Sequence, residues 1–155
     1  MVADIIPVAT GEAWIGFGVR SFRSVIRELI EGAQEQLVLT AYVLTNGEVV
    51  KSIVLALERG VTVKVYLYDG GEGKTVTEAA KSVLHLQEEF PYLEVKIVND
   101  RVLHAKIIVA DSRKVLVGSA NLTHRGLTSN YELGFLVEDS EIAGKILSLV
   151  RKVSE

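Results

Sequence analysis

A histidine and a lysine two residues apart stand out in the last third of the chain. His104 and Lys106 are the polar breaks in an apolar run that extends from Val102 to Ala110. Residues i and i+2 of a strand share one face, so an imidazole and an ammonium should project side by side. A neutral imidazole can attack phosphorus or move a proton near neutral pH. An ammonium is a point charge for phosphate oxygens, so the pair predicts chemistry at a phosphate.

A second apolar run, Val115 to Val117, ends at the tetrapeptide Gly118-Ser119-Ala120-Asn121. Between the two runs, Asp111-Ser112-Arg113-Lys114 indicates a short hairpin connection. Such a hairpin returns the end of the second strand to the start of the first. The tetrapeptide is therefore expected beside the histidine and the lysine.

The residue types after the hairpin suit a phosphate diester. The Ser119 hydroxyl and the Asn121 amide offer donors for an equatorial phosphate oxygen. Gly118 would let the backbone come close to a ligand. Glu132, further along the chain, could hold the second ring nitrogen of His104 and so orient it.

Taken together, these residues form the pattern HxKxxxxD…GSxN, which resembles the HKD motif of the phospholipase D superfamily. A lone histidine or lysine in a strand is usually structural, but the whole pattern in register favours function. The resemblance implies an α/β fold in which a mixed sheet is flanked by helices on both faces. Residues 1–155 would be a single phospholipase D-like domain with one motif, at residues 104–121.

HKD enzymes use two copies of the motif for each active site, and this chain has one. The resemblance therefore implies a homodimer with a shared site on its two-fold axis. One His104 would attack phosphorus to form a phosphohistidine, and the other would protonate the leaving oxygen and then activate water. Lys106 and Asn121 from both copies would clamp the phosphate with help from Ser119, while Glu132 would orient His104. Asp111 is expected to support the hairpin.

The scheme requires neither a metal nor a cofactor, because lysines and amides supply the charge stabilisation. A zinc site built from His104, His124 and Asp111 is an alternative, but its spacing matches no familiar zinc pattern.

Short single-motif members of the superfamily are mostly nucleases, so the expected substrate is DNA or RNA. Two alternatives stay open. One is a phospholipid phosphodiesterase or phosphatidyltransferase, and the other is a non-catalytic nucleic-acid-binding module of a larger system.

The polar stretch from Leu122 to Asn130 could form a substrate-contacting lip through His124 and Arg125, or it could be an ordinary solvated loop.

The composition is that of a globular protein, with 48% hydrophobic residues, no cysteine and a net charge of −3. The segment from Lys96 to Arg125 has six basic and two acidic residues, a local charge of +4, which leaves −7 for the remainder. A basic segment around the motif suits a phosphodiester ligand. Without a basic leader or an apolar run of transmembrane length, we expect a cytoplasmic protein that forms no stable membrane association.

Hydrophobic spacing predicts helices at 20–31, 47–59, 76–90 and 140–153. It also predicts strands at 36–44, 61–68, 94–98, 102–110, 115–117 and 132–137. Near the N-terminus, residues 5–8 and 14–17 could be short edge strands. Trp14 and Phe17 could belong to the core or to a partner surface, and we assign them to the core. Tyr42 is likewise assigned to the core, although it could point towards the site.

A glycine-rich segment, Asp69 to Thr75, imitates the end of a phosphate-binding P-loop, and Lys106 to Asp111 could imitate a Walker B strand. The P-loop motif requires a glycine where Tyr68 stands, so we disfavour nucleotide binding. Thr75 and Glu78 have the spacing of a helix capping box, which accounts for Thr75 without a ligand.

Overall fold

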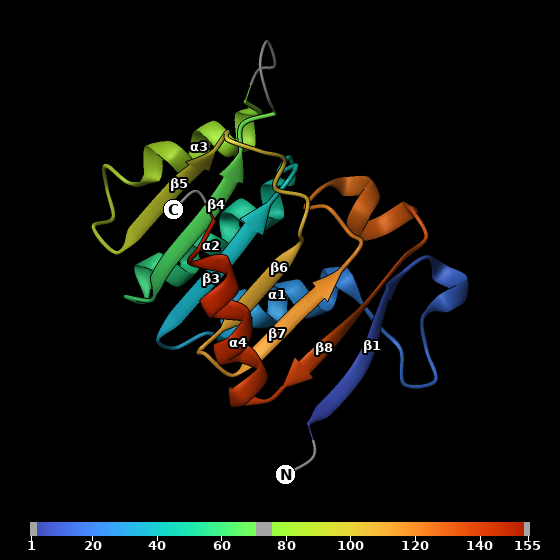
Figure 1. Ribbon diagram of the computed structural model, residues 1–155. Coiled ribbons are helices and arrows are strands. Elements are labelled where there is room, and N and C mark those ends of the chain that lie inside the picture. The colour runs from blue at the N-terminus through green and yellow to red at the C-terminus, as the bar shows by residue number, and fades with distance from the viewer. Residues whose placement is uncertain (1–2, 71–75, 154–155) are drawn as a thin grey trace.

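The protein, seen in a computed structural model, is an eight-stranded mixed sheet covered on both faces by helices (Figure 1). The structure describes residues 3–70 and 76–153. The strand order is β2-β1-β8-β7-β6-β3-β4-β5. The strands β3, β4 and β5 run parallel, and the pairs β3–β6, β6–β7, β7–β8 and β8–β1 run antiparallel. This arrangement confirms the predicted α/β fold with a mixed sheet.

The strands are β1 (Asp4–Thr10), β2 (Arg20–Ser21), β3 (Gln36–Ala41), β4 (Thr62–Tyr68), β5 (Leu93–Val98), β6 (Ile107–Ala110), β7 (Lys114–Gly118) and β8 (Glu132–Glu138). The helices are α1 (Phe22–Gly32), α2 (Gly47–Glu58), α3 (Glu78–Leu86) and α4 (Ser140–Val150). Two short turns of helix complete the fold, η1 (Glu12–Trp14) and η2 (Arg125–Ser129).

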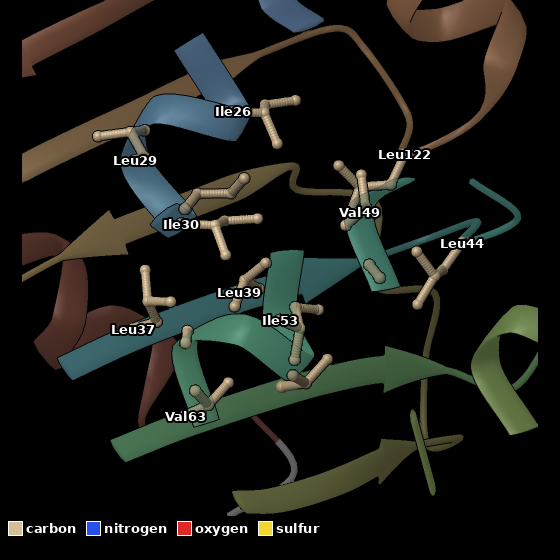
Figure 2. Packing of buried hydrophobic residues seen from close by; sticks show 14 of the residues in the cluster. Ile26, Leu29, Ile30, Leu37, Leu39, Leu44, Val49, Ile53, Val63 and Leu122 are labelled. Carbon is tan, nitrogen blue, oxygen red and sulfur yellow. The ribbon is translucent and has the colours of Figure 1, made fainter. Parts of the chain in front are cut away.

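The main core lies between the sheet and the helices α1 and α2. Figure 2 shows side chains of both helices, among them Ile30 and Ile53, pointing onto Leu39 of β3 and Val63 of β4. Phe22, Val25, Ile26, Leu29 and Ile30 are all buried at helical spacing on α1, as the sequence pattern predicted. The smaller α3 adds Ala80 and Val83 to this core.

Among the helices in the described residues, α4 is the one that covers the opposite face of the sheet. Ala143, Leu147 and Val150 of α4 belong to a second cluster with Val109 of β6 and Val115 of β7. Figure 1 shows this helix, in red, crossing the front of the central strands while β8 and β1 stay uncovered on that side. Helices therefore flank both faces, but the cover is unequal.

The helix α3 starts later than the sequence predicted. Thr77, not Thr75, is its N-cap, and its hydroxyl accepts from the backbone N–H of Ala80 at 3.1 Å. The same hydroxyl donates to the Leu44 carbonyl, which ties the helix start to the segment after β3. The helix ends at Leu86, before the expected Phe90. Residues 71–75, with most of the glycine-rich segment and the proposed Thr75 cap, lie outside the described residues.

The N-terminal segment differs most from the prediction. Residues 4–10 form a full strand, β1, and residues 14–17 form no strand. Trp14 is 46% exposed and Phe17 is fully exposed, so the prediction of core positions for them was wrong. Gly16 and Gly18 have positive φ angles of 111° and 89°, and the tight turn that they allow carries Phe17 away from the protein.

The hairpin between β6 and β7 is confirmed and has an unusual anchor. Asp111 and Ser112 both have positive φ, 54° and 53°, in a turn that the Arg113 N–H closes by donating to the Ala110 carbonyl at 3.1 Å. Three residues separate the paired positions Ala110 and Lys114. The Asp111 carboxylate accepts from the backbone N–H groups of Gln34, Glu35 and Gln36, at 2.8–3.2 Å. This one side chain therefore fastens the hairpin turn to the start of β3.

Burial alone would raise the pKa of the Asp111 carboxyl. The hydrogen bonds from Gln36, Glu35 and Gln34, with the charge of Arg113, outweigh burial and bring the pKa below its usual value. A carboxyl with a depressed pKa in the folded state stabilises the fold above its unfolded pKa. That stabilisation is lost as the pH falls through the folded value.

We predict that Asp111→Asn lowers the free energy of unfolding by about 1 kcal/mol at pH 7, because the three N–H groups lose a charged acceptor. Asparagine tolerates positive φ as aspartate does, so the change isolates the charge. The deficit should shrink below about pH 4. Urea unfolding at several pH values measures it.

The control is Asp139→Asn at the α4 N-cap, where the side chain accepts one N–H, from Ile142. Asparagine and aspartate cap helices about equally, so this variant should lose less stability. A deficit for Asp111→Asn that does not change with pH would contradict the account.

Candidate active site

The motif residues gather at one edge of the sheet, the upper edge in Figure 1. His104 and Lys106 precede β6, Ser119 and Asn121 follow β7, and Glu132 opens β8. Because β6 and β7 are antiparallel, the start of one lies beside the end of the other. The hairpin therefore brings the two halves of the motif together, as predicted.

His104 and Lys106 are not on the strand itself. The strand β6 begins at Ile107, and the two residues lie in the extended segment before it. Register pairing of β6 with β3 ends at Ile108 and Leu39. The predicted strand from Val102 was thus too long.

The buried hydroxyl of Thr40 holds this segment where the strand pairing ends. It donates to the Ala105 carbonyl at 2.6 Å and accepts from the Ile107 N–H at 2.9 Å. These two groups flank Lys106, so Thr40 fixes the backbone on both sides of it. The sequence analysis missed Thr40, although a hydroxyl inside an otherwise apolar buried strand was a usable signal.

The Lys106 ammonium lies against the His104 residue. Its Nζ donates to the His104 carbonyl at 2.8 Å and lies 3.3 Å from each ring nitrogen. Burial lowers the pKa of Lys106 below its usual value, and the negative charge of Glu132 opposes that shift. The lysine is therefore partly desolvated, a state in which an anionic ligand interacts strongly with it.

Tyr42, just beyond β3, is the neighbour of both residues. The ring centroids of Tyr42 and His104 are 4.8 Å apart in an edge-on arrangement. The Lys106 Nζ lies 5.3 Å from the centre of the same ring. Tyr42 is half-buried and belongs to the site, not to the core to which the sequence analysis assigned it.

Asn121 shares a small cavity of about 20 Å³ with Lys106, Tyr42 and Gly118. Its Oδ1 is buried, and no described residue provides a hydrogen-bond partner for it. Buried polar atoms are rarely left unpaired in folded proteins. The Asn121 Oδ1 is thus an acceptor without a donor, in a cavity whose lining also includes the polar side chains of Thr40, Tyr42 and Lys106.

The carboxylate of Glu132 binds Ser119 and Asn130. The Ser119 hydroxyl donates to Oε1 at 2.6 Å and the Asn130 amide donates to Oε2 at 3.1 Å. The hydroxyl also accepts from the Leu133 N–H at 3.0 Å. In this structure the Ser119 hydroxyl therefore donates its proton to Glu132. The expected contact of Glu132 with His104 is not among the hydrogen bonds of the described residues. The orienting role of Glu132 stays a prediction.

Gly118 has a packing role that differs from the predicted one. It pairs with Gly134 across β7 and β8, and the Phe22 ring lies over both. A Cβ at Gly118 would lie 2.7 Å from Phe22 Cζ and 2.8 Å from Gly134 Cα. The glycine therefore makes room for a core side chain.

The segment after Asn121 is ordered as the π-helical turn η2 and is less loop-like than expected. His124 and Arg125 are exposed at the start of this turn. The two side chains are close in sequence to Asn121 but do not line its cavity. A substrate-binding role for them stays a prediction.

Part of the local positive charge lies at the opposite end of the hairpin from His104 and Lys106. Arg113 and Lys114 are at the turn end of the hairpin, opposite to His104, and Arg113 pairs with Glu138 at 3.5 Å. Asp111 is at that end too, so the three residues of the alternative zinc site do not come together. The aspartate of the Walker B resemblance likewise lies away from the candidate active site. Among the described residues there is no cluster of three side chains that could hold a metal ion. In the same part of the chain, no helix has the length and apolar character needed to cross a bilayer.

Gly126 in η2 positions Asn121, and the sequence analysis did not single it out. A Cβ on Gly126 would lie 2.3 Å from the Asn121 carbonyl oxygen and 3.1 Å from its nitrogen. The Gly126 carbonyl accepts from the buried Thr10 hydroxyl at 2.7 Å, which prevents the turn from moving away.

We predict that Gly126→Ala destabilises the protein by about 1–3 kcal/mol, because the added methyl group must displace the Asn121 backbone. The control is Gly144→Ala in α4, where an added Cβ meets nothing within 4 Å. It should stabilise by about 0.5–1 kcal/mol, as alanine does in a helix. Thermal and urea unfolding measure the stabilities of the two variants. Equal stabilities would show that η2 can shift to accommodate the added methyl group.

Comparison with known proteins agrees with this geometry. Residues 26–153 match the family model described as "Cardiolipin synthase, PLD-like domain". The DISARM protein DrmC of Bacillus paralicheniformis is 30% identical over 138 residues, which cover 87% of this chain and 57% of that protein. Cardiolipin synthase A of Pseudomonas syringae is 29% identical over 124 residues, which cover 79% of this chain and 26% of that protein. The chain thus spans just over half of the first relative and about a quarter of the second.

The fold is similar to a solved structure, Nuc from Salmonella typhimurium, which is described as a phospholipase D family member. The TM-score is 0.80, and the match covers 98% of this chain and 94% of that chain. The sequences are 21% identical, so this likeness shows the fold alone.

Proposed function

Because the chain belongs to the phospholipase D superfamily of phosphodiesterases, we propose that it is a metal-independent endonuclease that hydrolyses DNA or RNA through a phosphohistidine. One observation carries the proposal most directly. The partly desolvated Lys106 ammonium and the Asn121 side chain line the same small cavity, and His104 is in contact with that lysine. The anionic oxygens of a phosphate diester can accept from the lysine ammonium and from the Asn121 amide N–H groups.

In the proposed reaction a ring nitrogen of His104 attacks phosphorus. A P–N bond forms, the P–O bond to the leaving group breaks, and His104 of a second copy gives its proton to the leaving oxygen. That second histidine then takes a proton from water, which attacks phosphorus and releases His104. Lys106 and Asn121 stabilise the charge on the equatorial oxygens throughout. Ser119 and Glu132 complete the polar wall, with Glu132 orienting His104 in the assembled site.

An exposed apolar surface beside the site supports the second copy. Val117, Leu133 and Phe135 are 40%, 51% and 47% exposed on the sheet face that α4 leaves uncovered. Val117 and Phe135 are paired across β7 and β8, and Leu133 follows directly after Glu132. Exposed apolar patches mark interaction surfaces. A copy docked here would bring its own His104 towards this one.

Nucleic acid is favoured over lipid by the rings next to the histidine. Tyr42 contacts His104, and Tyr68 is stacked behind Tyr42, with centroids 5.6 Å apart. Aromatic side chains beside a phosphate site are a common surface for unpaired bases. A lipid phosphodiester is the second candidate, because the matching family model and one relative are named for cardiolipin synthase.

We predict that the protein cleaves plasmid DNA, single-stranded DNA or RNA in excess EDTA. His104→Ala should reduce the rate by about 10³-fold or more, because it removes the nucleophile. His85→Ala, which changes an exposed histidine on α3, is the matched control and should cut normally.

Cutting by His104→Ala at the wild-type rate would contradict the mechanism. Phosphatidylglycerol and cardiolipin vesicles are assayed in parallel, and His104-dependent cleavage of lipid alone would establish the second candidate. Nucleic-acid binding with no cleavage of any substrate would indicate a non-catalytic binding module.

The shared site makes a separate prediction about mixed dimers. When wild type and His104→Ala are unfolded together in equal amounts and refolded, about one quarter of randomly assorted dimers contain two intact histidines. Activity should therefore fall to about one quarter of an equal total amount of wild type. The measurement is the cleavage rate at fixed total protein, with His85→Ala as the mixing control. Retention of half the activity would mean that each copy works alone.

A further inference from the structure

A second and larger cavity lies next to the small cavity lined by Lys106 and Asn121, at the C-terminal ends of β3 and β4. Its volume is about 330 Å³, at the lower end of the range of about 300–1,000 Å³ found for small-ligand sites. Small apolar side chains such as Ala41, Leu67 and Val102 form much of its lining. The proposed mechanism does not use this space.

The two cavities share a wall formed by Ala41, Tyr42 and Val43, and Tyr42 is its aromatic residue. On one side its ring meets the edge of His104 at 4.8 Å, and the Lys106 Nζ lies 5.3 Å from its centre. Its other neighbour is Tyr68, which is nearly parallel to it at an interplanar angle of 13°. The larger cavity therefore begins one aromatic ring away from the reacting histidine.

The lining of the larger cavity fits an uncharged planar group. Tyr42 and Tyr68 provide aromatic surface, and both are half-buried. Among the described residues that line the cavity there is an acidic side chain, Asp69, but no lysine or arginine. The described lining residues offer a second phosphate no lysine or arginine, whereas a heterocyclic base would gain stacking and apolar contact from them.

We propose that this cavity is a nucleobase subsite, in which a base of a nucleotide next to the scissile phosphate stacks against Tyr68. The inference rests on the proposed function and adds to it the form of the substrate. A base in a duplex is already paired and stacked, so it must be unstacked before it can enter such a cavity. The subsite therefore selects unpaired strands and gives little sequence preference, because every base has a π face.

The experiment measures binding of two single-stranded oligonucleotides of equal length, one with bases and one fully abasic. His104→Ala protein is used throughout so that nothing is cleaved. Tyr68→Leu removes the aromatic ring and keeps an apolar side chain, Tyr68→Phe keeps the ring, and Tyr92→Leu changes an exposed tyrosine before β5. Circular dichroism and thermal unfolding of each variant establish that it is folded.

Tyr68→Leu should bind the base-containing strand about 10-fold more weakly and leave affinity for the abasic strand unchanged. Tyr68→Phe and Tyr92→Leu should bind both strands within about twofold of the parent protein. An equal loss for both strands, or no loss for either, would overturn the subsite. So would weaker binding of Tyr68→Leu to phosphatidylglycerol vesicles with unchanged oligonucleotide binding, because the cavity would then hold a lipid.

Failure of the subsite and failure of the function are separable. If the protein with an intact His104 cuts nucleic acid but the base-containing and abasic strands bind alike, the subsite is wrong and the nuclease stands. If the protein neither binds nor cuts nucleic acid, the proposed function is wrong and the subsite falls with it.

Discussion

The hydrogen bonds of the buried Thr40 hydroxyl hold the segment that carries His104 and Lys106 against the central strand β3. At this point β6 has not yet begun, so the ordinary pairing of strands cannot fix the segment. The Thr40 hydroxyl takes the place of that pairing, because it donates to the carbonyl before Lys106 and accepts from the N–H after Lys106. The backbone can therefore depart from the regular sheet without leaving buried polar groups unpaired. This departure turns the side chains of His104 and Lys106 towards the edge of the sheet where the site lies.

The hairpin that carries the motif is fastened at both ends, and this explains how one motif combines chemical and structural residues. Thr40 fixes the end with His104 and Lys106. Asp111 fixes the opposite end by accepting three N–H groups at the start of β3. A phosphate clamp needs its groups held in place, and anchoring a hairpin at its turn keeps its strands in register. The motif aspartate thus acts far from the proposed chemistry and still contributes to the geometry of the site.

The sequence predicted what depends on periodicity and on local spacing. Helical repeats located α1 and α2 closely, and the spacing from His104 to Asn121 located the hairpin that joins the two halves of the site. It did not predict features that depend on a tertiary neighbour. The role of Gly118 depends on Phe22, a residue nearly one hundred positions earlier, and the start of β6 depends on the Thr40 hydroxyl. Phe17 was misassigned because hydrophobicity alone does not reveal that Gly16 and Gly18 turn it outwards.

The unpaired groups of the site indicate why the fold keeps an arrangement that costs it stability. A buried amide oxygen without a partner and a lysine whose pKa is lowered by burial are both unfavourable in the isolated protein. Neither is needed to hold the sheet together, because Thr40, Asp111 and the apolar clusters do that. The lysine gains most when a ligand supplies an anionic oxygen, and the amide oxygen gains when a ligand supplies a hydrogen-bond donor. Since Tyr42 forms a wall of this cavity and of the larger apolar one, a ligand that satisfies both would join an anionic group to a planar one. A nucleotide has both of those parts, whereas the glycerol backbone of a phospholipid has no planar ring to place against Tyr68.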